Sequence, residues 1–130
     1  MRIIVQKFGG TSVATAEGRE LVRGKIKQAL VAGFKPVVVV SAMGRRNDPY
    51  ATDTLIELLK KENATPNKHE LDFMMCCGEM ISAGVMASGL QQDGLRSLAL
   101  TGGQAGIITD DQHGTARILK IDTKNLLQLV

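Results

Sequence analysis

The stretch IIVQKFGGTS, from Ile3 to Ser12, decides the fold of this chain. Its first six residues are mostly β-branched or aromatic, which predicts a buried strand over residues 3–8. Gly9 and Gly10 follow at once and predict a tight turn, because glycine tolerates backbone angles that other residues avoid. The hydroxyl side chains that come next can cap a following helix.

A helix and a second strand follow this turn. Apolar side chains recur at helical spacing from Glu17 to Ala32, which predicts a helix with one apolar face. Gly33 ends that helix, and Pro36 prevents its resumption. The β-branched run Val37–Val40 is typical of strands that are covered on both faces in parallel sheets. The order strand, helix, strand predicts a right-handed βαβ unit, and therefore an α/β protein with a mainly parallel sheet.

The remaining sequence continues this alternation, and we find no linker, repeat or low-complexity tract in it. The expected elements are a helix from Thr52 or Asp53, a long helix over Lys68–Gln92, a third strand over Leu95–Thr101, short strands over Gly106–Thr109 and Ala116–Ile121, and a last helical turn over Asn125–Val130. One side of the long helix is expected to carry Leu71, Met75, Gly78, Ser82, Val85, Met86 and Gly89. Residues 1–130 are expected to form one domain.

Composition excludes several classes of protein. Sixteen basic residues against 13 acidic ones give a net charge of +3, and aromatic residues make up only 3% of the chain. A nucleic-acid binder would carry a dense basic stripe with stacking aromatic side chains, so we expect no nucleic-acid partner. No charge-free apolar stretch approaches the length that spans a bilayer, and Gln6 and Lys7 come too early for a signal peptide. We expect a cytoplasmic protein without a membrane partner.

The two cysteines, Cys76 and Cys77, are neighbours within an apolar helical stretch. Neither a C-x-x-C motif nor a cysteine–histidine spacing suited to a metal is present, so no metal site is expected. His69 and His113 stand alone in polar surroundings and indicate no metal or catalytic role. Both thiols are predicted to be buried and reduced, because free cysteine packs as a small apolar side chain.

An anion site is one interpretation of the first glycine turn. Lys7 lies at the end of the strand, and Gly9 and Gly10 let backbone N–H groups approach a phosphate without obstruction from a Cβ atom. The Walker A and dinucleotide-binding patterns are both absent. Ser41 begins the Ser-Ala-Met-Gly loop after the second strand and should lie near these glycines, because parallel strands end at the same edge of a sheet. A plain turn with a solvated lysine fits these residues nearly as well.

Glu79 and Thr52 are further candidates for a binding site. Glu79 lies among methionine, cysteine and isoleucine residues, and an unpaired carboxylate is costly to bury. It therefore either points into solvent or meets a cation in a cleft. Thr52 precedes a leucine-rich helix, where a Thr-Asp pair usually acts as an N-cap. The residues alone leave these alternatives open.

Four segments taken together resemble the aspartate kinases: Lys7–Val13 (KFGGTSV), Val37–Gly44 (VVVVSAMG), Thr52–Asp53 and Gly78–Ser82 (GEMIS). The first segment is the most specific, and the resemblance covers essentially the whole chain in order. The segment Pro49–Asp53 is similar to that of the bacillus-type, diaminopimelate-sensitive isoform. The resemblance implies the amino-acid kinase fold, an α/β/α sandwich around a mostly parallel sheet, of which this chain would form the amino-terminal half.

The resemblance also implies a reaction and a set of site residues. Aspartate kinases use ATP with Mg²⁺ to phosphorylate the β-carboxylate of L-aspartate, the first step towards lysine, diaminopimelate, threonine and methionine. The matched residues are Lys7, Phe8, Gly9, Gly10 and Ser41 on the ATP-phosphate side, and Thr52 and Glu79 on the aspartate side. Lys7 would neutralise the transferring phosphoryl group, and Glu79 would pair with the substrate's ammonium group.

Aspartate kinases are much longer than this chain, and its apolar end at Val130 carries no stop signal. The resemblance therefore implies a piece without the nucleotide base and ribose pocket, an aspartate-binding arginine, a catalytic aspartate and the regulatory ACT domains. We expect such a piece to be inactive alone, and its unpaired sheet edge to favour a homo-oligomer. Two alternatives remain: a kinase for acetylglutamate, glutamate, carbamate or UMP, and a non-catalytic anion-binding or assembly module.

Overall fold

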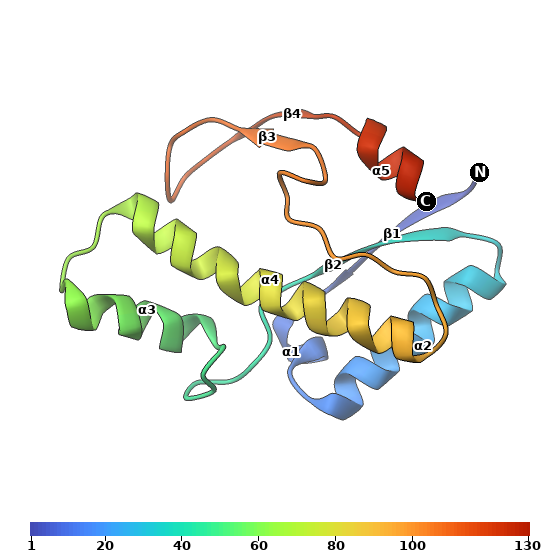
Figure 1. Ribbon diagram of the computed structural model, residues 1–130, viewed down its shortest axis with the longest axis horizontal. Coiled ribbons are helices and arrows are strands. Elements are labelled where there is room, and N and C mark those ends of the chain that lie inside the picture. The colour runs from blue at the N-terminus through green and yellow to red at the C-terminus, as the bar shows by residue number, and fades with distance from the viewer.

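A computed structural model describes residues 1–130 and contains five helices and four strands (Figure 1). In chain order these elements are β1 (Ile3–Phe8), α1 (Gly10–Val13), α2 (Ala16–Val31), β2 (Lys35–Val40), α3 (Thr52–Glu62), α4 (Lys68–Gln92), β3 (Ile107–Thr109), β4 (Ile118–Ile121) and α5 (Lys124–Leu129).

The predicted βαβ unit is present. Strand β1 pairs with β2 in parallel, from Ile3 opposite Lys35 to Phe8 opposite Val40. Helix α2 connects the two strands, and the Thr15 side chain caps its start by accepting a hydrogen bond of 3.0 Å from the backbone N–H of Gly18. This pairing confirms the α/β class and brings the carboxyl ends of both strands to one edge of the sheet.

The core lies where α2 and α4 pack against each other and against β2. Its buried side chains are Val13, Val22, Ile26, Met43, Met86 and Leu90, and the strand residues Phe8, Val38 and Val40 pack against them. Along β1 the burial alternates: Ile4, Gln6 and Phe8 are half-buried, whereas Ile3, Val5 and Lys7 are exposed. In this chain, helices therefore cover one face of β1 and leave the other open.

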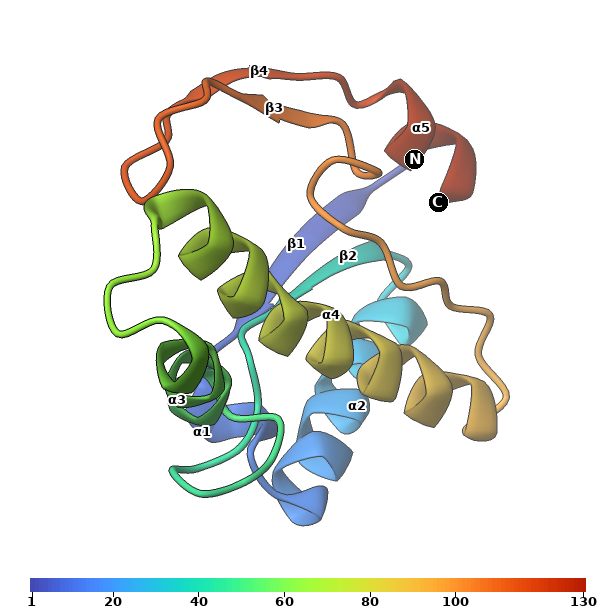
Figure 2. The same ribbon diagram turned by 60° about the vertical axis from the view of Figure 1, so that its left-hand side comes forward.

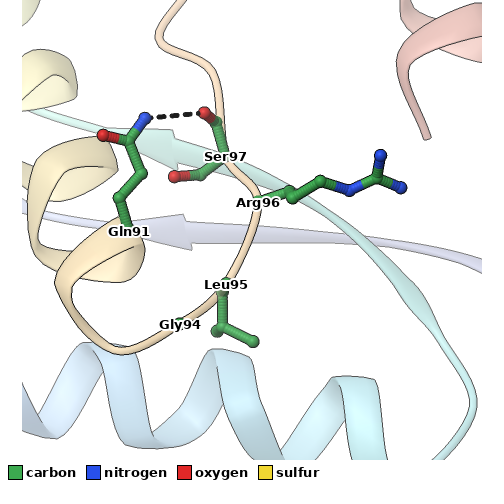
Figure 3. Close-up of a pocket in the computed structure, with 5 residues that line it drawn as sticks. All are labelled: Gln91, Gly94, Leu95, Arg96 and Ser97. Atoms are coloured by element: carbon green, nitrogen blue, oxygen red, sulfur yellow. Dashed lines mark hydrogen bonds between the residues drawn. The ribbon is translucent and has the colours of Figure 1, made fainter.

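The expected third strand over Leu95–Thr101 is wrong. This segment pairs with no strand, because its first residues are hydrogen-bonded to α4 instead. The Ser97 hydroxyl donates to the Ala87 carbonyl at 2.8 Å, and the Gln91 side-chain amide donates to the Ser97 carbonyl at 3.0 Å (Figure 3). An apolar groove lies between this segment and the edge of β2.

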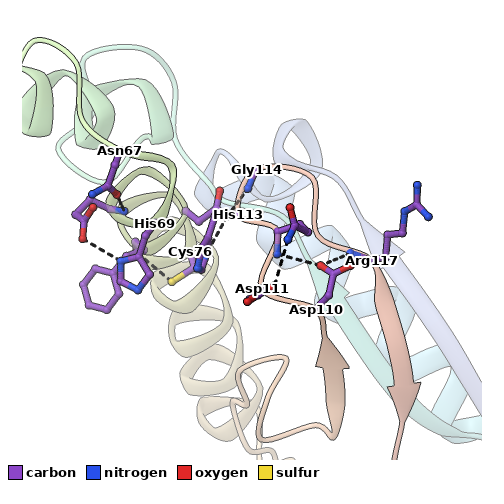
Figure 4. Close-up of polar contacts among 12 residues, drawn as sticks. Asn67, His69, Cys76, Asp110, Asp111, His113, Gly114 and Arg117 are labelled. Carbon is purple, nitrogen blue, oxygen red and sulfur yellow. Dashed lines mark hydrogen bonds and ion pairs between the residues drawn. The ribbon is translucent and has the colours of Figure 1, made fainter.

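Two short strands do form at the predicted place, but in a separate sheet. Strands β3 and β4 pair antiparallel, and their connecting turn rests on the start of α4 (Figures 2 and 4). The backbone N–H of Gly114 donates to Asp72 Oδ2 at 2.7 Å, and the rings of His69 and His113 meet edge to face with centroids 4.8 Å apart. These two histidines therefore join the hairpin to α4 rather than standing alone.

Helix α4 differs from the sequence expectation in two respects. Its buried positions are Gly78, Ser82, Met86, Ala87 and Leu90, whereas Met75 and Val85 are exposed. Its cysteines are not buried, because Cys76 is exposed and Cys77 is half-buried. By length and hydropathy alone α4 could cross a membrane, a test that the core helix of a globular protein also passes.

An ion-pair cluster fixes the end of α4 against α2. Asp93, just after α4, accepts from Arg23 Nε at 2.9 Å and lies 2.9 Å from Lys27 Nζ through the same carboxylate oxygen. Hydrogen bonds from Lys27 and Arg23 hold the pKa of the Asp93 carboxyl below its ordinary value. A carboxyl with a lowered pKa in the folded state stabilises that state above its unfolded pKa, and this contribution is lost as the pH falls through the folded value.

We therefore expect Asp93→Asn to lower the urea midpoint of unfolding at pH 7. The difference from the parent chain should begin to shrink as the pH falls below about 3.9, the ordinary pKa of aspartate, and should vanish below the lowered pKa of the folded state, where Asp93 is protonated in folded and unfolded chains alike. The measurement is urea unfolding followed by circular dichroism across this pH range. Glu62→Gln, which removes an exposed carboxylate without an ion pair, is the matched control. An Asp93→Asn midpoint equal to that of the control at pH 7 would contradict the assignment.

Candidate functional site

The turn between β1 and α1 forms one side of the candidate site. Lys7 is exposed near the end of β1, and its ammonium lies over the turn, 3.7 Å from the position that a Cβ on Gly9 would take. Gly9 has extended backbone angles and is the N-cap of α1. N–H groups in the first turn of a helix have no acceptor within the helix. The Lys7 ammonium therefore lies beside the N–H groups of this first turn, of which that of Ser12 donates to the Gly9 carbonyl at 3.0 Å.

The loop after β2 lies directly beside this turn, as expected. The backbone N–H of Ser41 donates to the carbonyl of Phe8 at 3.1 Å, which extends the strand pairing by one residue. A Cβ on Gly10 would lie 2.9 Å from the carbonyl oxygen of Ala42, closer than real Cβ contacts allow. Only glycine at position 10 lets the two loops approach this closely.

The first residue of α3 and the middle of α4 form the other side of this cluster. A Cβ on Gly78 would lie 3.0 Å from the Ala42 side chain and 3.5 Å from the Thr52 hydroxyl oxygen. Ala51, not Thr52, is the N-cap of α3, so the interpretation of Thr52 as a helix cap is wrong. The Thr52 hydroxyl is half-buried and makes no hydrogen bond to the protein, which leaves it available to a ligand.

Glu79 follows Gly78 in α4 but faces differently. Its side chain is exposed, forms no ion pair, and lines the apolar groove beside β2 together with Met80 and Ala83. Lys7 does not line that groove, and the two charged side chains do not contact each other. The structure thus brings Gly10, Ser41, Thr52 and Gly78 together. Lys7 adjoins this cluster because its ammonium lies over Gly9, and Glu79 adjoins it because it follows Gly78 in the chain.

Arg19 is a residue that the sequence analysis did not single out. Its guanidinium donates from Nη1 to the carbonyls of Val13 at 2.9 Å and Ala14 at 3.2 Å, and the same nitrogen lies 3.9 Å from the sulfur of Met43. It therefore ties the end of α1 to the loop after β2. A signal was present in the sequence: a basic residue in the first turn of a helix opposes the helix dipole and needs another reason to be there.

The site offers donors for an anion but no set of ligands for a bare metal ion. No group of three or more His, Cys, Asp or Glu side chains lies close enough together to hold one. The chemistry that this cluster can provide is recognition of an anion such as phosphate by a lysine and backbone amides, next to a hydroxyl; the Glu79 carboxylate lies in the neighbouring groove.

The chain is thus an α/β protein with a lysine and two glycines at the end of its first strand, packed against a second small-residue loop. The profile of the Amino acid kinase family matches residues 2–130, and this chain belongs to that family.

Within the family, this chain is similar to proteins named as aspartokinases. It is 49% identical over 130 residues to Aspartokinase 1 of Bacillus subtilis (strain 168), and 43% identical over 126 residues to an aspartokinase of Geobacillus stearothermophilus. These matches cover 100% and 97% of this chain, but only 32% and 30% of the two relatives. The chain therefore spans about a third of the length of the curated relatives it matches.

A solved structure agrees with this placement. The crystal structure of the aspartate kinase from Synechocystis matches with a TM-score of 0.72 and 39% sequence identity, over 83% of this chain and 18% of that one. Together with the parallel β1–β2 pair, this confirms the expected α/β fold of the family.

The contact of Gly10 with the loop after β2 can be tested by substitution. We expect Gly10→Ala to destabilise the chain by about 1–3 kcal/mol, the usual cost of overpacking, because the new Cβ meets a backbone carbonyl that cannot swing away. Gly24→Ala in the middle of α2 is the matched control, since a Cβ there meets nothing within 4 Å. It should stabilise the chain by roughly 0.5–1 kcal/mol through helix propensity. Urea unfolding measures both; equal effects of the two variants would contradict the close approach.

Proposed function

We propose that this chain is part of an aspartate kinase, which transfers the terminal phosphoryl group of ATP to the β-carboxylate of L-aspartate and forms 4-phospho-L-aspartate. The observation that carries the proposal is the 49% identity to a named aspartokinase over every residue of the chain. The reaction would be the first step towards lysine, diaminopimelate, threonine and methionine.

Lys7 and the neighbouring backbone would serve the phosphate side. Phosphoryl transfer depends on positioning and charge stabilisation more than on covalent chemistry by the protein. The Lys7 ammonium over Gly9 would offset the negative charge of the transferring group, and the backbone at Phe8, Gly9 and Gly10 would hold it in place. Ser41 is bound to the Phe8 carbonyl and would present its hydroxyl to the same anion.

Thr52 and Glu79 would serve the aspartate side. The Thr52 hydroxyl has no protein partner and lies next to Gly78, so it can bind a carboxylate of the substrate. Glu79 is a carboxylate without a cationic partner in this chain, and the ammonium group of aspartate would provide one. A charge-assisted hydrogen bond of this kind is stronger than one between neutral groups.

ATP with Mg²⁺ fits the phosphate side of this site. The lysine ammonium over Gly9 favours an anion over a neutral ligand at this turn. ATP would supply the phosphoryl group, and Mg²⁺ would be bound together with its phosphates. The residues of this chain would orient the phosphates and the acceptor carboxylate.

Which part of the reaction these residues serve follows from the length of the chain relative to its relatives. Relatives three times as long share this chain's segment, so we propose that residues 1–130 are the amino-terminal, aspartate-binding part of the catalytic domain and that the nucleotide base is bound elsewhere. On this proposal the 130 residues alone do not catalyse the reaction. The complete enzyme would be a cytoplasmic homo-oligomer. In the 130 residues alone, the unpaired strand edges and exposed apolar side chains such as Val5 and Val39 favour association.

The reaction is tested with the full-length enzyme that carries this sequence. ADP release is measured with ATP and Mg²⁺ in the presence of aspartate, glutamate, acetylglutamate or carbamate, and with UMP as an alternative acceptor. Among these acceptors, we expect ADP release only with aspartate. Phosphorylation of glutamate or UMP without aspartate would overturn the proposal in favour of another amino-acid kinase.

Two substitutions distinguish the proposed phosphate side of the site from the proposed aspartate side. Lys7→Ala should lower kcat by about 10²-fold or more, because it removes a charge that stabilises the transition state. Glu79→Gln should mainly raise the KM for aspartate, by roughly 10-fold or more, and leave the KM for ATP nearly unchanged.

Glu62→Gln is the matched control for the second substitution, because Glu62 is an exposed carboxylate at the far end of α3. It should leave both KM values unchanged. Unaltered aspartate kinetics in the Glu79→Gln variant would show that this carboxylate does not bind the substrate.

A further inference from the structure

The two cysteines of α4 converge on one point of the helix surface. Cys76 Sγ donates to the carbonyl of Phe73 at 3.1 Å (Figure 4). Cys77 Sγ donates to the same oxygen at 3.4 Å. Consecutive residues of a helix normally point about 100° apart. Here both side chains point back towards the preceding turn of the helix, so the two sulfur atoms share one acceptor.

A disulfide between these thiols is excluded while the helix persists. A disulfide requires Cα atoms about 4.4–6.8 Å apart, whereas neighbouring residues with a trans peptide are about 3.8 Å apart. The structure has no cis peptide bond. The helix therefore keeps the two sulfurs from bonding directly to each other, and a third atom that bridges them would relieve this geometric restriction.

Negative charge surrounds the pair. Partial burial, the neighbouring Cys77 thiol and the carboxylates of Glu79 and Asp72 together raise the pKa of the Cys76 thiol. A second thiolate is thus disfavoured until a positive centre binds both sulfurs. Such surroundings select a soft cationic or electrophilic centre over a further anion.

The cysteine pair is accessible, but no third side chain lies close enough to complete a metal site with it. Cys76 is exposed and lines the apolar groove beside β2, and Cys77 is half-buried next to it. No third metal-ligating side chain completes a site, so an ion that needs three or four protein ligands would not be held. The ligand must be one that two thiolates satisfy and that carries an apolar group for the groove.

We propose that Cys76 and Cys77 form a two-thiolate site for a thiophilic trivalent centre that bears one organic group, the class to which monosubstituted arsenicals belong. Binding forms two sulfur–arsenic bonds: an arsenic oxide takes up the two thiol protons and loses its oxygen as one water. No oxidant or reductant takes part. The site is independent of the proposed phosphoryl transfer, although it lies one helical turn from Glu79.

The test uses phenylarsine oxide and the 130-residue chain, in which these are the only two cysteines. One equivalent should remove both titratable thiols and raise the mass by one phenylarsine oxide less one water. The adduct should be reversed by dimercaptopropanol but not by an equal concentration of mercaptoethanol. Helical circular dichroism should be the same before and after binding, because the site is formed within the intact helix.

Single variants show whether both sulfurs bind. Cys76→Ser and Cys77→Ser should each weaken binding by about 10²-fold or more, because chelation by a second thiol in the same molecule is lost. Met75→Leu keeps both thiols and should bind as the parent does. Loss of only one thiol per chain, unchanged affinity in either single variant, or melting of the helix on binding would overturn the proposal.

Discussion

Hydrogen-bonded pairing of β1 with β2 in parallel is the constraint on which the rest of this structure depends. Because both strands end at the same edge, the glycine turn after β1 and the small-residue loop after β2 must share one narrow space. The Ser41 N–H bond to the Phe8 carbonyl continues the pairing into that space, and Gly10 fits under the Ala42 carbonyl. A side chain at position 10 would push the loops apart and open the cradle for the phosphate.

Helix α4 links this edge of the sheet to the core. Gly78, Ser82, Met86 and Leu90 recur every four residues and face inwards, so a single stripe contacts the site at Gly78 and the hydrophobic core at Met86 and Leu90. The ion pairs of Asp93 with Arg23 and Lys27 fix the far end of the same helix to α2. The position of Thr52 against Gly78 is therefore supported by packing that extends along the whole length of α4.

Three polar groups that we propose to bind a ligand have no ion pair within the chain. The Lys7 ammonium, the Thr52 hydroxyl and the Glu79 carboxylate have no ion pair within the chain, although other charges nearby, such as Arg23 and Asp93, are paired. Arg19 shows the contrast: its Nη1 donates to the carbonyls of Val13 and Ala14 and so ties the end of α1 to the start of α2.

The sequence by itself determined the βαβ unit, the α/β class and the family, because strand and helix periods and the Lys-Phe-Gly-Gly-Thr-Ser string are local properties of the chain. It also indicated that Ser41 lies near Gly10, since parallel strands end together. Only the tertiary structure decided that residues 95–101 are held by α4 instead of pairing as a strand, that Ala51 rather than Thr52 caps α3, and that the two thiols are accessible. Each of these depends on which distant group supplies a hydrogen bond or covers a side chain, and residue type and spacing do not contain that information.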